Sequence, residues 1–152
     1  MMNRIDIDWV QGRASLGAAA GWTAEEIRLV ADLGYALAEQ GRNQEAITVF
    51  NGLAALAPAT GYFQAALGAL WLREGETLHA IRYLNSALTI DPQDIGALVN
   101  RGEAFLQAGE REAAARDLEA ALRLEETGRA AVHMPNLTRA RALLAQLKSQ
   151  DR

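Results

Sequence analysis

The chain of 152 residues contains no cysteine, few aromatic residues and no run of basic residues. Without cysteine, disulfide bonds and thiolate metal sites are excluded. Aromatic residues make up only 6% of the sequence, so most of the core must come from aliphatic side chains. The formal net charge is −4, from 15 basic and 19 acidic residues, which disfavours nucleic acid as a partner.

Long apolar runs are also missing. No apolar stretch of about 18 residues occurs, and Asp6 and Asp8 interrupt the N-terminal region where a secretion signal needs an unbroken apolar segment. We therefore expect a cytoplasmic protein without direct membrane insertion. Apolar residues nevertheless make up 50% of the chain and charged residues 22%, which is enough for a folded domain of ordinary size.

The main positive feature is a repeat with an offset of 34 residues. The recurring positions are Gly34, Gly68 and Gly102; Gly41, Gly75 and Gly109; Ala46, Ala80 and Ala114; Phe50, Leu84 and Leu118; and Pro58 and Pro92. The first glycine and the alanine allow two helices to approach closely, and the second glycine can adopt the left-handed backbone that ends a helix. Each unit is therefore predicted to be a helical hairpin.

The helix limits follow from caps and breakers. Asn43 and Thr77 follow the turn glycines and are predicted N-caps of the second helices, and Pro58 and Pro92 lie where those helices must stop. The predicted pairs are 24–40 with 43–57, 61–74 with 77–90, and 95–108 with 110–124.

Both ends of such an array need a covering element. At the C-terminal end we predict a loop over 128–135 and then a capping helix, within a terminal region 129–152. The apolar residues of that helix have the spacing of an amphipathic helix: Leu137, Ala140, Leu143, Leu144 and Leu147. At the other end Thr23 and Glu26 predict a capping box, so residues 1–22 form a separate segment.

The N-terminal segment is too apolar for a solvated tail, because it carries Ile7, Trp9, Val10 and Leu16. Two interpretations remain open. These residues form a dimer or partner contact, or they pack back onto the repeats.

The pattern of small and large residues resembles the tetratricopeptide repeat, in three consecutive copies over about 27–60, 61–94 and 95–128. The resemblance implies an all-α fold in which three helix-turn-helix repeats, within residues 23–128, form a right-handed superhelix with a C-terminal capping helix. Arg101 departs from the family pattern, since a large apolar residue is usual there. A plain antiparallel helical bundle is the alternative.

No catalytic constellation is visible in the sequence. The histidines, His79 and His133, lie in different units, and no nucleophile with a base, metal cluster or cofactor loop is recognisable. We expect a non-enzymatic protein without a cofactor.

Function is expected on the concave surface formed by the first helix of every unit, which suits an extended or helical peptide. By analogy with tetratricopeptide proteins, the groove residues are Ala31, Tyr35, Ala38, Tyr62, Ala65, Ala66, Ala69, Leu72, Val99, Glu103 and Leu106. This set is mainly apolar, and its alanines leave room for larger side chains of a ligand. The cations and amides that would hold a terminal carboxylate are largely missing, so a hydrophobic ligand is predicted.

A narrower resemblance covers about residues 20–128. The stretches that carry it are 41–46, 49–56, Tyr62-Phe63, 67–69 and 102–110. They resemble the class II chaperones of bacterial type III secretion. The resemblance implies a cytoplasmic chaperone that binds hydrophobic translocator proteins, holds an extended segment of them in the groove and keeps them competent for export. It further implies anchor pockets at Tyr35, Tyr62, Ala65, Ala69 and Leu72, and a homodimer formed by the N-terminal helix.

Two other binding functions remain open. The chain could be a general tetratricopeptide adaptor, or an assembly chaperone for the needle subunit of the same secretion apparatus. The client would separate these readings, because a needle subunit is a small helical hairpin whereas a translocator carries long apolar segments.

Overall fold

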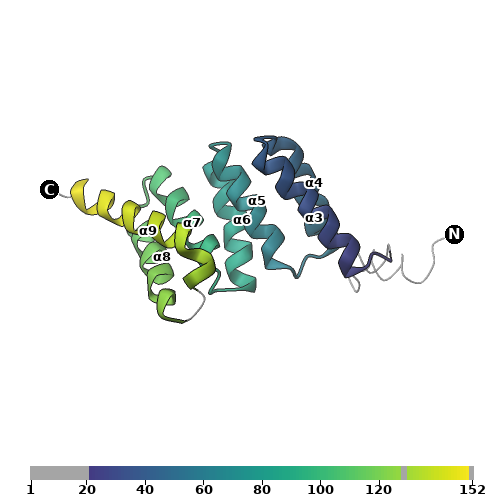
Figure 1. The fold of residues 1–152 in the computed structure, drawn as a ribbon. Coiled ribbons are helices and arrows are strands. Elements are labelled where there is room, and N and C mark those ends of the chain that lie inside the picture. The colour runs from purple at the N-terminus through teal and green to yellow at the C-terminus, as the bar shows by residue number, and fades with distance from the viewer. Residues whose placement is uncertain (1–20, 128–129, 151–152) are drawn as a thin grey trace.

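Residues 21–127 and 130–150, which the computed structural model describes, form seven α-helices and a short 3-10 helix joined by tight turns (Figure 1). The elements are α3 (Ala24–Glu39), α4 (Asn43–Leu56), α5 (Gly61–Arg73), α6 (Thr77–Ile90), α7 (Ile95–Gln107), α8 (Arg111–Arg123), η1 (Leu124–Thr127) and α9 (Ala130–Gln150). Each helix packs on the next one in the chain, and α5 also contacts α7. The six hairpin helices begin and end within one residue of the predicted limits, which confirms the helical repeat.

Glycines shape the hairpins in two predicted ways, by ending the first helix of each unit and by allowing close helix packing. Gly41, Gly75 and Gly109 have φ values of 74°, 77° and 80°, the left-handed backbone that ends the first helix of each unit. The other glycine allows close helix packing, because a Cβ atom on Gly68 would lie 2.4 Å from Cγ of Leu84. Both roles recur once per unit, so the 34-residue period reflects repeated backbone geometry.

The predicted N-caps at Asn43 and Thr77 are wrong. Both residues are the first residue of their helix, one position too late for a cap. Their side chains bond to the next unit instead: Asn43 Nδ2 donates to Glu74 Oε1 at 2.8 Å, and Thr77 Oγ1 donates to Gln107 Oε1 at 3.1 Å. These polar residues therefore join consecutive hairpins.

The predicted capping box at the start of α3 is confirmed. The backbone N–H of Glu26 donates to Thr23 Oγ1 at 3.2 Å, and the backbone N–H of Thr23 donates to Glu26 Oε2 at 2.7 Å. Two N–H groups that would otherwise lack a partner are satisfied in this way, which sets the beginning of the first hairpin.

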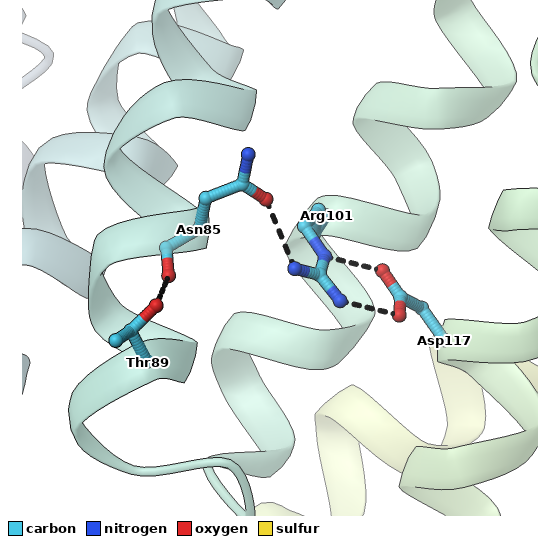
Figure 2. A network of polar contacts seen from close by, with 4 residues as sticks. All are labelled: Asn85, Thr89, Arg101 and Asp117. Carbon is cyan, nitrogen blue, oxygen red and sulfur yellow. Dashed lines mark hydrogen bonds and ion pairs between the residues drawn. The ribbon is translucent and has the colours of Figure 1, made fainter.

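Arg101 is accommodated by a network that joins three helices (Figure 2). Its Nε and Nη2 donate to the two carboxylate oxygens of Asp117 at 2.6 and 2.8 Å, and its Nη1 donates to Asn85 Oδ1 at 2.9 Å. Asp117 is only 7% exposed, so its charge depends on this partner. A polar bridge between α6, α7 and α8 thus replaces the apolar contact that is usual at this position.

The predicted loop over 128–135 is wrong from residue 130 onwards, because α9 begins at Ala130 and contains Pro135. Proline inside a helix removes one backbone hydrogen bond, and α9 nevertheless continues through Pro135 to Gln150. The predicted capping contact itself is confirmed, since α9 packs on α7 and α8 and buries Leu137, Ala140 and Leu147.

The core consists of two apolar clusters. One contains buried residues between 31 and 70, from α3, α4 and α5, and the other contains buried residues between 72 and 147, reaching α9. Trp71 packs against both clusters. Among the helices of the described ranges, none combines the length and the apolar character that crossing a bilayer requires.

Candidate functional site

A continuous groove runs over α3, α5 and α7. It consists of two cavities of about 350 and 290 Å³ that share Tyr35, Ala66 and Asn100 in their linings. Each shared residue comes from the first helix of a different hairpin. The two cavities therefore lie over the first helices of all three units.

One wall of the groove is aromatic. The rings of Tyr35 and Tyr62 lie 5.5 Å apart, and the Tyr35 ring meets Phe50 edge-on at 5.0 Å. Tyr62 is 55% exposed, so much of its ring is available for contact. Burial, followed by the interactions with Tyr62 and with the charge of Asp94, raises the pKa of the Tyr35 hydroxyl well above its usual value. Tyr35 therefore remains a neutral hydrogen-bonding group at neutral pH.

The part of α5 that lines the groove is built from alanine. Ala65, Ala66 and Ala69 are partly exposed there, and Ala38 of α3 faces the same cavity as Ala69. Because these side chains end at Cβ, the groove has room for larger apolar side chains of a bound segment. Leu72, at the same end as Ala69, is only 9% exposed and mainly supports the site from the core.

The opposite wall is polar, and α9 supplies part of it. Asn136 and Arg139 of α9 line the larger cavity together with Asn100 and Glu103 of α7. Arg139 Nε lies 3.5 Å from Glu103 Oε2, and its guanidinium also donates to Asn100 Oδ1. Apolar anchors on one side and hydrogen-bonding groups on the other suit an extended peptide, which has both side chains and free backbone groups to place.

The polar wall was not predicted from the sequence, because a loop was expected where α9 begins. The repeat itself contained the missing signal, since α7 begins at Ile95 and an offset of 34 residues leads to position 129, next to the observed start at Ala130. The 13 residues of α7 and the first part of α9 are thus equivalent elements of consecutive units.

Of the predicted groove residues, eight line the two cavities. They are Tyr35, Ala38, Tyr62, Ala65, Ala66, Ala69, Leu72 and Glu103. Three others do not: Ala31 and Val99 are buried in the core, and Leu106 packs against the second apolar cluster. Helical spacing alone could not separate the groove face from the adjoining core face. Ile7, Trp9, Val10 and Leu16, predicted as a dimer contact, lie outside the described residues.

Within residues 21–127 and 130–150, no three His, Asp or Glu side chains are grouped so that they could hold a metal ion. The groove is thus the candidate site for which this structure gives a geometry.

Comparison with known proteins identifies the fold. Residues 95–127 match the family model of the tetratricopeptide repeat. The chain has the tetratricopeptide repeat fold. None of the curated protein sequences is significantly similar to it.

Several solved structures are similar over most of the chain. A type III secretion complex from Aeromonas hydrophila has a TM-score of 0.83 at 22% identity, covering 95% of both chains. The type III secretion translocator chaperone SycD of Yersinia enterocolitica, in an alternative dimer, has a TM-score of 0.78 at 22% identity, covering 86% of this chain and 97% of its own.

A third similar structure contains a bound segment. PcrH in complex with the chaperone binding region of PopD has a TM-score of 0.78 at 20% identity, covering 87% of this chain and 98% of its own. At these sequence identities the similarity establishes a shared fold and does not establish shared binding partners.

Proposed function

We propose that this protein is a non-enzymatic cytoplasmic chaperone that binds a hydrophobic translocator of a type III secretion system. The groove of α3, α5 and α7 holds an extended segment of the client and keeps the client soluble before export. The observation that carries the proposal is the pairing of a tyrosine wall with small alanine side chains in one continuous groove. The similar folds of a translocator chaperone and of a chaperone with a bound client region support it.

The physical case rests on the shape and chemistry of the groove. A segment in extended conformation turns alternate side chains to one side, so apolar residues can enter the space above Ala65, Ala66 and Ala69. Tyr35 and Tyr62 offer large rings with little rotamer freedom to lose. Asn100 and Asn136 carry amide groups that can pair with backbone N–H and C=O groups of the client.

A client with membrane-inserting segments would need its apolar segments covered before export, and such a groove can cover one of them. Exposed apolar segments aggregate in water, and occupying one of them lowers that tendency without energy from a nucleotide. We further propose that residues 1–22 contribute a homodimer contact, an expectation supported by the dimeric arrangement of SycD.

The test is affinity capture from native cells grown under secretion-inducing conditions, followed by calorimetric titration of segments of the captured client. Tyr62→Ala removes an exposed ring, and Ala66→Trp fills the part shared by both cavities. We expect each substitution to weaken segment binding by roughly tenfold or more, as for central anchors of an interface. Leu72 is left unchanged because altering this buried residue would disturb the core.

Leu78→Ala is the matched control, because Leu78 is an exposed apolar residue of α6 outside both cavity linings. It should bind like the unmodified protein. Capture of a protein with transmembrane-like segments, lost in both groove variants, agrees with the proposal. Capture of only a small helical hairpin would indicate a needle-subunit chaperone, and soluble partners with equal recovery by the groove variants would indicate an adaptor.

A further inference from the structure

The outer face of α3, at the N-terminal end of the hairpin stack, is apolar and open. Leu29 is 60% exposed and Leu33 is 54% exposed, and Trp22 is an exposed aromatic residue just before the helix. Helical residues are about 100° apart, so Leu33 and Tyr35 are separated by about 200° around the axis. Leu33 therefore points away from the groove, while Glu39, on the groove side of the same helix, lines the larger cavity.

The apolar residues of this face follow the spacing of a coiled-coil seam. Within α3, Leu29, Leu33 and Ala36 are separated by four and three residues, which are d, a and d positions of a heptad pattern, and Trp22 lies just before the N-cap Thr23. Such a seam accepts the side chains of a second helix running along it. An α-helix is thus the kind of element that fits this face.

An acidic row borders the seam. Glu25, Asp32 and Glu39 recur every seven residues at the g position of the same pattern, and all three are exposed. None of them forms an ion pair with a described residue. The g positions of a seam select partners by charge, so this row calls for lysine or arginine beside the apolar residues of the second helix.

The charge pattern also bears on which helix can bind. The helix α3 carries four acidic residues and one basic residue, Arg28. Pairing with α3 of a second copy would bring two acidic helices together, and like charges at short range oppose association. A basic helix of another protein is complementary in both apolar spacing and charge.

We propose that the outer face of α3 docks an amphipathic helix of a partner protein, with apolar residues at the a and d positions and basic residues beside them. The apolar part of this surface lies outside both cavity linings, and the proposal goes beyond the proposed chaperone function. A bound client segment and a helical partner can then be held at the same time.

The test uses two labelled peptides of three heptads with leucine at a and d, one with lysine and one with glutamate at the e and g positions. Binding to the full chain is followed by fluorescence anisotropy at low and high salt. We expect the lysine peptide to bind roughly tenfold tighter than the glutamate peptide, with the difference reduced by salt. Leu29→Glu with Leu33→Glu should abolish this binding, and thermal melting verifies that the variant is folded.

A charge-reversal variant tests the role of the acidic row more directly. The variant Glu25→Lys with Asp32→Lys should prefer the glutamate peptide, since it reverses the charge of the row at two residues outside both cavity linings. The groove variant Ala66→Trp should bind the lysine peptide as the unmodified chain does, which separates this surface from the proposed client site.

Four results would overturn the proposal. The first is an unchanged peptide preference after charge reversal, and the second is loss of peptide binding in Ala66→Trp. The third is a dimer in sedimentation that Leu29→Glu with Leu33→Glu converts to monomer, which would assign the face to a second copy. The fourth is a gain in peptide affinity on deleting residues 2–20, which would assign the face to the chain's own N-terminal segment.

Discussion

At the scale of single residues, the pair formed by Arg101 and Asp117 shows how an atypical residue is retained in a repeat. Two parallel hydrogen bonds hold the guanidinium against a carboxylate that is nearly buried. Such a pair contributes little net stability compared with apolar packing, but removal of one partner leaves a charge without compensation.

We predict that Asp117→Ala lowers the free energy of unfolding by about 2–4 kcal/mol, because the Arg101 charge loses its partner. The double variant Arg101→Leu with Asp117→Ala should recover most of that loss, since it restores an apolar contact between α7 and α8. Urea titrations of both variants measure the difference. Glu45→Ala, which breaks the exposed pair with Arg42, serves as the control and should leave the urea midpoint unchanged.

A second residue prediction concerns Gly68. An added methyl group would overlap Leu84, which is fully buried, so Gly68→Ala should destabilise the fold by about 1–3 kcal/mol. Gly52 of α4 has open space around its Cα, and Gly52→Ala should instead stabilise by about 0.5–1 kcal/mol through the helix propensity of alanine. Equal effects in thermal melting would show that close packing is not the reason for glycine at position 68.

At the scale of helices, α9 both covers the third hairpin and supplies a wall of the groove. Its first residues occupy the place of another unit's first helix, and its apolar residues fill the end of the second core cluster. The same helix carries Pro135 in its interior, where proline lacks the donor for a helical hydrogen bond.

We predict that Pro135→Ala raises the free energy of unfolding by about 1–3 kcal/mol, because alanine restores the hydrogen bond and Pro135 is exposed. Thermal melting followed by circular dichroism measures the gain. Pro58→Ala, in the turn after α4, is the control and should bring no such gain. A loss of stability in Pro135→Ala would mean that the helix begins at the proline.

The hairpins were predictable because their signals are local and repeated: turn glycines, small residues at the crossing points and one capping box. The start of α9 was not, because Pro135 is a local helix breaker and only the 34-residue offset from Ile95 leads to position 129. The polar side of the groove depended on that helix and was missed with it. Val99 shows another limit, since its spacing fits the groove but tertiary packing buries it.

At the scale of the whole molecule, the core is divided between the N-terminal and C-terminal halves of the stack. The stability of such an array is approximately the sum of the stability of each repeat and of the interfaces between adjacent repeats. A local defect is therefore expected to destabilise nearby helices more than distant ones. Trp71 packs against both clusters and links them.

We predict that Phe50→Ala, costing about 3–5 kcal/mol, raises amide hydrogen exchange in α3, α4 and α5 more than in α7, α8 and α9. Leu118→Ala is the mirror variant and should produce the opposite distribution. Hydrogen exchange with mass spectrometry resolves both patterns. The same increase along the whole chain in both variants would instead indicate one cooperative unit.

The equivalence of α9 with a first helix has a consequence for how such proteins lengthen. Leu143 stands 34 residues after Gly109, so the helix continues where the earlier units turn back. The number of units is therefore governed at one backbone position near the end of the array. A glycine there, followed by the sequence of a second helix, would add a hairpin, and duplication of this kind would lengthen the groove.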